Sequence, residues 1–157
     1  MIDLQRRQVT TSLPQVARIT SVTEESARVQ TLTLDLRMEA APGQYVMVWL
    51  PGVDEKPFSL VSADPVTLTI ARVGPFTEAV HRLKAGDTIW VRGPLGRPFA
   101  LPDARIPRPG SRILMVAGGY GVAPLYFLAQ RARAAGWHVS VVIGARMTGK
   151  PRLPTSK

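Results

Sequence analysis

Cysteine is absent from the 157 residues of this chain, and histidine occurs only twice. Without cysteine, the chain can form no disulfide, no thiolate zinc site and no cysteine-ligated iron–sulfur cluster of its own. The histidines, His81 and His138, lie far apart, without metal-ligand spacing or a neighbouring nucleophile, and we expect both to be structural or exposed. We therefore predict no metal centre and assign no catalytic residue from these side chains.

Aromatic and acidic residues are also scarce. Aromatic residues make up 6% of the chain, and 11 acidic residues face 20 basic ones, which gives a net charge of +9. Clustered cations would favour nucleic-acid binding, because they release counterions from phosphates. Here the arginines are dispersed, and no aromatic residues alternate with them as in single-strand binders. We rank nucleic-acid binding last and interpret most of the charge as a solvated surface, with a few cations reserved for an anionic cofactor.

Long hydrophobic runs are missing as well. The apolar stretches, such as residues 113–117 and 139–143, are far too short to cross a bilayer. The first eight residues have no hydrophobic core behind their arginines, so no secretory signal is expected. Together with the absence of cysteine, this pattern favours a cytoplasmic protein without a membrane span.

Short strands separated by proline and glycine turns dominate the first hundred residues. Apolar and polar residues alternate over 16–21 and 29–36, which predicts an antiparallel hairpin with a polar break at 24–26. Residues 44–50 are apolar enough to predict a strand buried on both faces, and Trp49 and Trp90 are expected in the core. Further strands are expected at 58–62, 66–73 and 87–92, with one helix at 76–84. This pattern is typical of a closed antiparallel barrel.

The pattern changes after a stretch rich in proline and basic residues. A strand at 112–117, a helix at 122–135 and a strand at 138–143 predict one right-handed βαβ unit with parallel strands. A doubly wound sheet needs several strands covered on both faces, so this second domain is expected to be incomplete. The predicted organisation is a barrel at 14–100, a linker at 101–110, a partial βαβ unit at 111–146 and an irregular tail at 147–157.

A glycine cluster joins the first strand of this unit to its helix. Gly118, Gly119 and Gly121 would let the backbone approach a ligand, and the free N–H groups at a helix start favour anions. Pro124 stands where the dinucleotide-binding fingerprint has a third glycine. The cluster fits either a phosphate-bearing cofactor or a plain strand-to-helix turn.

A second candidate stretch spans residues 56–59. Pro57 stiffens the chain where it enters a strand. Around it, Lys56 could neutralise a phosphate, Phe58 could stack on a flat ring and Ser59 could hydrogen-bond a ring nitrogen. The alternative is an ordinary turn with a buried phenylalanine. Ser59 has no recognisable general base nearby, so a catalytic triad is not predicted.

A third candidate stretch lies at residues 72–77. Arg72 at a strand end, followed by a glycine turn and by Thr77 at a helix start, could form a second anion cradle. The alternative is a routine helix cap by Thr77. Because the second and third stretches lie on successive strands of one barrel, they could face one pocket. Arg146, at the end of the last expected strand, is a position where a 2′-phosphate could be read.

Four motifs, taken in chain order, resemble those of the ferredoxin reductase superfamily: KPFS at 56–59, RVGPFT at 72–77, GPLGRPF at 93–99 and GGYGVAPL at 118–125. Within it, PGQYVMVWLP at 42–51 is most similar to electron-transfer subunits of dihydroorotate dehydrogenase. The resemblance covers residues 14–146. It implies a β plus α/β fold, in which an antiparallel Greek-key barrel binds FAD and a Rossmann-like nucleotide-binding domain, incomplete here, follows.

The resemblance also implies roles by position. Lys56 stands near the FAD diphosphate where the family usually has arginine, Phe58 lies against the isoalloxazine, and Ser59 lies near its reactive nitrogen. Lysine lacks the bidentate fork of arginine, so it would hold the diphosphate less firmly. The other cofactor-binding positions are Pro57 in the same motif, Ile70, Ala71 and Arg72 on the next FAD-contacting strand, Phe76 and Thr77 in the diphosphate loop, and Gly118, Gly119, Gly121 and Pro124 in the nicotinamide-side turn.

Members of the family continue with further strands and helices and end in a cysteine cluster that holds [2Fe–2S], so the resemblance implies a C-terminally truncated chain. It implies electron flow from NADH through FAD and the cluster to a partner flavoprotein that oxidises dihydroorotate, a step of pyrimidine biosynthesis. The first hypothesis is thus a flavin-binding component that serves a dihydroorotate dehydrogenase catalytic subunit, or a sulfhydrogenase-like complex. The alternative is a non-enzymatic remnant or docking barrel. We expect this chain alone to bind FAD at most, with an incomplete NAD(P)H site.

Overall fold

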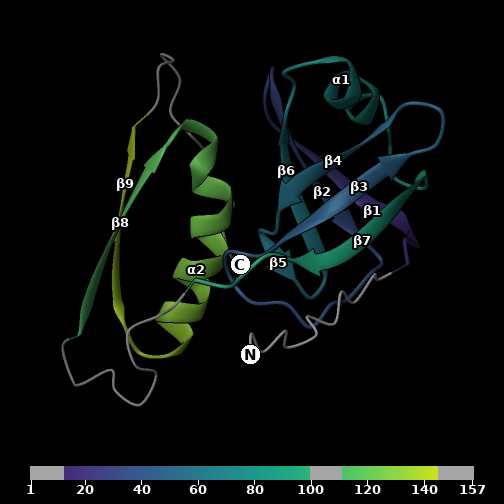
Figure 1. Cartoon of the computed structure of the whole chain (residues 1–157). Coiled ribbons are helices and arrows are strands. Elements are labelled where there is room, and N and C mark those ends of the chain that lie inside the picture. Colours follow the sequence, from purple (N-terminus) through teal and green to yellow (C-terminus); the bar gives the residue numbers. More distant parts are fainter. Residues whose placement is uncertain (1–12, 100–110, 145–157) are drawn as a thin grey trace, which may run out of the picture.

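The computed structural model describes residues 13–99 and 111–144. Its first sheet begins with a hairpin. β1 (Gln15–Ser26) pairs antiparallel with β2 (Val29–Leu34). The sheet continues with β3 (Tyr45–Leu50), β4 (Asp54–Ser59), β5 (Ser62–Ala63), β6 (Val66–Ala71) and β7 (Thr88–Leu95). Its order is β4-β3-β7-β1-β2-β6-β5, all antiparallel, and helix α1 (Pro75–His81) lies at one end (Figure 1). The predicted antiparallel barrel is confirmed.

Aliphatic side chains from alternate strand positions fill the inside of the barrel. In β6, for example, Val66, Leu68 and Ile70 are fully buried, as the two-residue period of a strand requires. The edge strand β4 contacts β6 without forming a ladder with it. The link after β4 is tied down by two backbone bonds: Leu60 N donates to Gln44 O (3.2 Å), and Val61 N donates to Thr67 O (2.9 Å). Packing and isolated hydrogen bonds therefore bring the two ends of the sheet together.

The tryptophans lie outside this core, contrary to prediction. β3 is buried on one face only: Val46 and Val48 point inward, whereas Trp49 is 38% exposed. Trp49 pairs across the sheet with Trp90 of β7, and their rings pack edge to face with centroids 5.5 Å apart. Because aliphatic residues already fill the inner positions, the alternation of the strands puts both rings on the outer face. The expectation of a strand buried on both sides was therefore wrong.

Two strand boundaries also differ from those expected. The residues predicted as a polar break, 24–26, still belong to β1, and the turn is formed by Ala27 and Arg28. The strand predicted at 58–62 instead spans Asp54–Ser59, because β3 and β4 pair from Leu50 opposite Asp54 to Tyr45 opposite Ser59. Cross-strand pairing thus extends both strands through polar residues that a hydrophobic pattern reads as turns.

The second unit is a βαβ arrangement, as predicted. β8 (Arg112–Gly118) leads through the short 3-10 helix η1 (Gly119–Gly121) into α2 (Val122–Ala134), and β9 (His138–Gly144) returns parallel to β8. Met115 of β8 packs against Leu128 and Ala132 of α2. Phe127, also on α2, belongs to the core cluster of the barrel, so α2 lies between the two sheets (Figure 1). The linker at 101–110, Arg146 and the tail at 147–157 lie outside the described residues.

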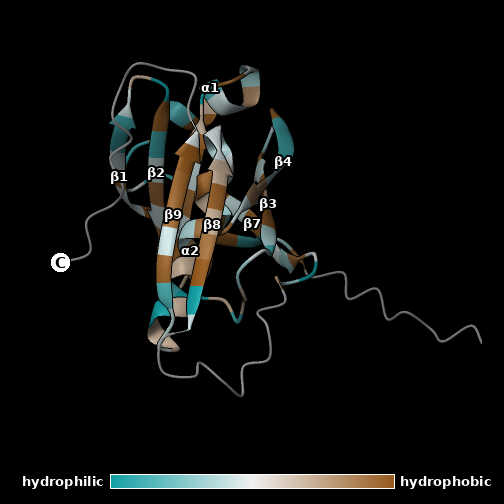
Figure 2. Cartoon of the chain, turned by 90° about the vertical axis from the view of Figure 1, so that its left-hand side faces the viewer, coloured by the Kyte–Doolittle hydropathy of each residue, from teal (hydrophilic) through white to brown (hydrophobic). Residues whose placement is uncertain are grey.

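One face of the β8–β9 sheet has no cover within the described residues. Leu114, Val116 and Val142 are 64%, 68% and 54% exposed. Figure 2 shows this face, with hydrophobic residues along both strands. Parallel sheets are normally covered on both faces, which makes this bare apolar surface unusual. Among residues 13–99 and 111–144, no helix is long and apolar enough to span a membrane.

Gly43 is predicted to be the glycine of the barrel least able to accept a side chain. Its φ is +93°, and an added Cβ would lie 2.8 Å from the backbone nitrogen of Phe99. Gly52 is the matched control, because its φ is +77° but a Cβ there would meet nothing within 4 Å. Both alanine variants pay for the left-handed backbone, and overpacking should add about 2 kcal/mol at Gly43. Urea unfolding of Gly43→Ala and Gly52→Ala measures this difference, and equal midpoints would contradict the prediction.

Candidate functional site

β4 places the residues of the KPFS stretch on two faces. Opposite β3, Phe58 pairs with Val46 and Lys56 with Val48, and both valines point into the barrel. Paired residues lie on the same face of a sheet, so Lys56 and Phe58 share the inner face of this edge strand. Pro57 and Ser59 alternate onto the other face. Phe58 and Ser59 are half-buried, whereas Lys56 and Pro57 are exposed.

A ring contact joins this strand to the first turn of α1. The rings of Phe58 and Phe76 are stacked, with centroids 6.0 Å apart and planes inclined by 24°. Phe76 is buried at 5% exposure in the first turn of α1, and Phe58 is half-buried. The two stretches expected to share a pocket are therefore in direct contact.

Thr77 organises the loop that leads into α1. Its hydroxyl accepts hydrogen bonds from Val73 N (2.8 Å) and Gly74 N (3.0 Å) and donates to Gly74 O (2.9 Å). The side chain is buried, so this hydroxyl acts on its own loop, as in the capping alternative. An added Cβ at Gly74 would meet nothing within 4 Å, so the loop backbone faces open space.

At the end of β6, the side chains of Ile70 and Arg72 are engaged in contacts within the protein. The side chain of Ile70 is fully buried in the core, and its carbonyl oxygen lies 3.0 Å from the His81 ring nitrogen, which gives that histidine a structural contact. Ala71 is half-buried. The guanidinium of Arg72 donates to Ala27 O (3.1 Å) in the β1–β2 turn. In this structure the Arg72 side chain therefore contacts the β1–β2 turn.

The glycine turn after β8 is open. Added Cβ atoms at Gly118, Gly119 or Gly121 would meet nothing within 4 Å, whereas one at Gly43 would clash with Phe99. Only Gly119, with φ +52°, needs glycine for its backbone shape. Close packing therefore does not explain the other two glycines, and their free surface leaves room for a ligand.

Pro124 fits the turn for a backbone reason. It is the third residue of α2 and is half-buried. N–H groups in the first turn of a helix have no intrahelical partner, so a proline there sacrifices no hydrogen bond. This explains how proline can replace the third glycine of a dinucleotide fingerprint without disrupting the helix.

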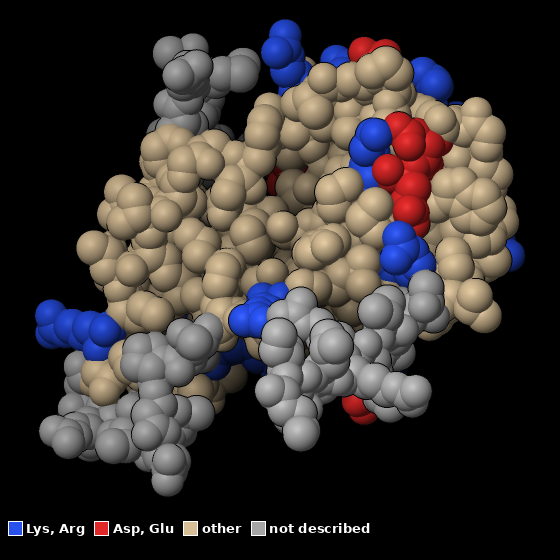
Figure 3. Space-filling view, viewed as in Figure 1, with Lys and Arg blue, Asp and Glu red and all other residues tan. Residues whose placement is uncertain are grey.

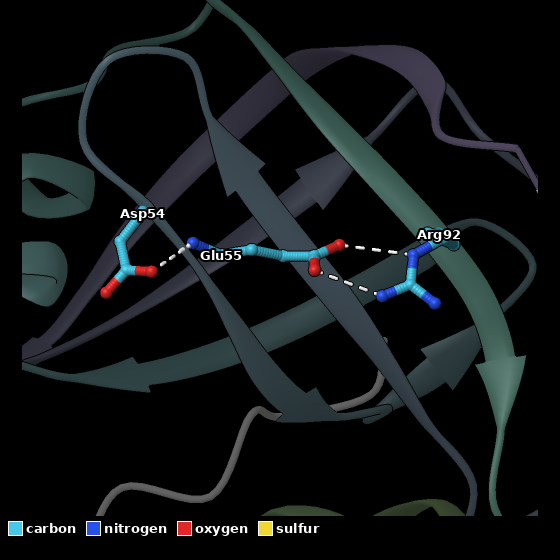
Figure 4. Close-up of polar contacts among 3 residues, drawn as sticks. All are labelled: Asp54, Glu55 and Arg92. Atoms are coloured by element: carbon cyan, nitrogen blue, oxygen red, sulfur yellow. Dashed lines mark hydrogen bonds and ion pairs between the residues drawn. The ribbon is translucent and has the colours of Figure 1, made fainter.

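Charged side chains on β4 divide between its two faces. On the inner face, Lys56 Nζ forms an ion pair with Asp54 Oδ2 at 2.5 Å, and this contact lowers the pKa of Asp54. On the outer face, Glu55 accepts two hydrogen bonds from Arg92, at 3.0 and 3.2 Å, which raise the pKa of Arg92 (Figure 4). In the space-filling view, acidic side chains gather over the barrel between basic ones (Figure 3).

No group of three metal-ligating side chains occurs within the part of the chain that the structure describes. A shallow hollow of about 470 Å³ lies elsewhere, between β1, β2 and the end of α1, and it is lined by His81 and Lys84 among others. None of the predicted cofactor-binding residues lines it.

Curated relatives are identical to this chain at more than two fifths of the aligned positions. One, from Methanocaldococcus jannaschii, is named a probable dihydroorotate dehydrogenase B (NAD(+)), electron transfer subunit, and is 42% identical over 133 residues. The match covers 85% of this chain and 48% of the relative. A relative of the same name from Methanothermobacter thermautotrophicus is 44% identical over 141 residues, covering 86% of this chain and 50% of the relative. No protein-family model matches the chain.

Solved structures agree in fold. An NADH-dependent reduced ferredoxin-NADP oxidoreductase, studied for flavin-based electron bifurcation, is 27% identical with a TM-score of 0.73, and the match covers 85% of this chain and 50% of the other. The ferredoxin-NADP+ reductase of Plasmodium falciparum, at 16% identity, shares the fold with a TM-score of 0.74, over 92% of this chain and 66% of that one. The chain is similar in sequence to these electron-transfer subunits and resembles the ferredoxin reductase superfamily in fold.

The chain spans about half the length of the curated relatives it matches. The resemblance to electron-transfer subunits of dihydroorotate dehydrogenase, first seen in the residue motifs, is confirmed by those relatives. The superfamily fold of a barrel followed by part of a nucleotide-binding domain is also confirmed.

The sequence motifs assigned no role to Asp54 or Glu55. Both lie on β4, and each has an ion-pair partner. The available signal was the spacing of Asp54 and Lys56: residues two apart share a face of a strand, but not of a turn. Placing the strand four residues too late concealed that relationship.

Proposed function

We propose that this chain binds FAD and serves as the flavin-bearing electron-transfer component of an NAD(P)H-linked oxidoreductase. The partner would be a dihydroorotate dehydrogenase catalytic subunit, in line with the names of the relatives. The observation that carries the proposal is the Phe58–Phe76 contact, because it joins β4, which carries Lys56, to the start of α1, where the Gly74 backbone is open.

The residues at this edge fit the parts of FAD. Phe58 would pack against the flat ring system, since offset aromatic stacking is favourable. Ser59, at the end of β4, would hydrogen-bond a ring nitrogen, and Pro57 would hold the strand that presents both. Lys56 would attract the diphosphate, while Thr77 holds the loop whose backbone approaches it. Bound FAD would supply the two-electron chemistry that no side chain of this chain provides.

Other proposed positions act indirectly. The buried side chain of Ile70 leaves only its backbone for a cofactor, and Phe76 acts as a support for Phe58. Ala71 and Arg72 would border the site, with Arg72 anchored to the hairpin turn.

The glycine turn is proposed as the nicotinamide side of the site. Gly118, Gly119 and Gly121 leave space for NAD(P)H, and Pro124 preserves the start of α2. The βαβ unit at 111–146 would be part of the nucleotide-binding domain, after the barrel at 14–100. A [2Fe–2S] cluster does not fit, because the sequence offers no cysteine to ligate it.

FAD uptake by the purified chain tests the proposal. The protein should take up added FAD with a flavin absorbance spectrum, and Phe58→Leu should weaken binding about 3- to 10-fold, because leucine keeps the apolar contact but loses ring stacking. Trp49→Phe is the matched control, since Trp49 lies on the outer face of the barrel. A protein that binds no FAD would contradict the proposal and favour a docking barrel without cofactor chemistry.

A further inference from the structure

Asp54 is held in place from two sides. One carboxylate oxygen, Oδ1, accepts a hydrogen bond from the backbone nitrogen of Glu55 at 2.7 Å, and the other, Oδ2, contacts the Lys56 ammonium. The hydrogen bond from Glu55 N, drawn in Figure 4, uses a different carboxylate oxygen from the contact with Lys56. The carboxylate therefore stays beside Lys56 even when the ammonium finds another partner.

Apart from Lys56, no positively charged side chain on β4 neutralises the Asp54 carboxylate. Glu55 and Arg92 neutralise each other on the outer face of the sheet. On the inner face Asp54 and Lys56 lie beside each other, with both side chains about half exposed. An anion that approaches Lys56 thus meets a neutral pair that contains a fixed negative charge.

We propose that Asp54 is a specificity-determining residue, which competes with the phosphates of an incoming cofactor for the ammonium of Lys56. The inference rests on the proposed FAD function. Asp54 lowers the affinity for the diphosphate part of the cofactor and leaves contacts of the flat ring with Phe58 unchanged. It therefore narrows the preference for FAD over flavins that lack phosphate.

The Asp54→Asn variant tests this inference. Asparagine keeps an oxygen for Glu55 N but removes the charge, so β4 should remain intact. We expect FAD to bind about 3- to 10-fold more tightly at ~0.05 M salt, where like charges interact over a long Debye length, and the gain to shrink in ~1 M salt. Riboflavin, which has no phosphate, should bind equally to both proteins. Tryptophan fluorescence and flavin absorbance titrations measure all three affinities.

Asp64→Asn is the control for a general change of charge. Asp64 pairs with Arg37 at 3.0 Å and precedes β6, at the opposite end of that strand from Arg72. It should leave FAD binding nearly unchanged. Equal or weaker FAD binding by Asp54→Asn, an equal gain in Asp64→Asn, or an equal gain for riboflavin would overturn the inference while leaving the proposed function standing.

Binding of inorganic pyrophosphate distinguishes failure of the proposed FAD function from failure of the inference about Asp54. If the unmodified chain binds no FAD, the proposed function fails. Tighter pyrophosphate binding by Asp54→Asn would still support the competition between Asp54 and an anion. Unchanged pyrophosphate binding, alongside unbound FAD, would overturn the inference together with the function.

Discussion

Replacing Thr77 by valine should lower the free energy of unfolding by about 3 kcal/mol and weaken FAD binding at least about 10-fold. Valine has nearly the same shape but no hydroxyl, so the backbone N–H groups of Val73 and Gly74 lose their acceptor and Gly74 O loses a donor. An unsatisfied donor in a partly buried loop costs about 1–3 kcal/mol. The loop would then no longer present its backbone to a diphosphate in one conformation.

Thr77→Ser is the matched control for this loss. Serine keeps the hydroxyl and removes one buried methyl group, which should cost about 1 kcal/mol. Urea unfolding followed by circular dichroism gives the stability of both variants. FAD titration well below the unfolding midpoint gives the affinity. If the serine and valine variants lost stability equally, packing of the methyl group, and not the hydroxyl, would be the function of Thr77.

The sequence pattern predicted the architecture well because the inner positions of the barrel are strongly apolar. Val66, Leu68 and Ile70 alternate with threonines, and the strand they predict is present. The βαβ unit was equally legible, since its helix and strands differ in period and are separated by glycine. These elements are specified by local pattern alone.

The errors share one physical origin: cross-strand pairing. β4 begins at Asp54 because β3 offers it a partner across a three-residue turn, although its first residues are charged. Trp49 and Trp90 face outward because the register, and not hydrophobicity, decides which face a residue takes. Neither the partner strand nor its register can be read from a hydropathy pattern.

The cofactor-binding roles of the candidate residues stay predictions. The contact between Phe58 and Phe76 shows that the two barrel stretches lie side by side. By contrast, the hydroxyl of Thr77 is used within its own loop, and the Arg72 guanidinium contacts the hairpin turn. Such side-chain pairings depend on distances across the fold, so motif position did not reveal them.

Lys56→Met should weaken FAD binding about 10- to 100-fold, because a charge-assisted contact with the diphosphate is lost and nothing in the variant replaces it. Riboflavin binding should not change, since the substitution leaves the Phe58 ring in place. Lys84→Met provides the same loss of charge beyond the end of α1, on an exposed side chain away from β4, and should change FAD affinity little. Titration with both flavins measures the difference.

Lys56→Arg should have the opposite effect, about 2- to 5-fold tighter FAD binding, because a guanidinium binds phosphate oxygens with two parallel hydrogen bonds. The fork also suits the carboxylate of Asp54, which remains fixed by the Glu55 backbone. The full gain should therefore appear only in the double variant Lys56→Arg, Asp54→Asn, whose affinity should exceed the product of the two single gains. Strict additivity would show that Asp54 and residue 56 act independently, and a methionine variant as tight as the unmodified chain would exclude Lys56 from the diphosphate site.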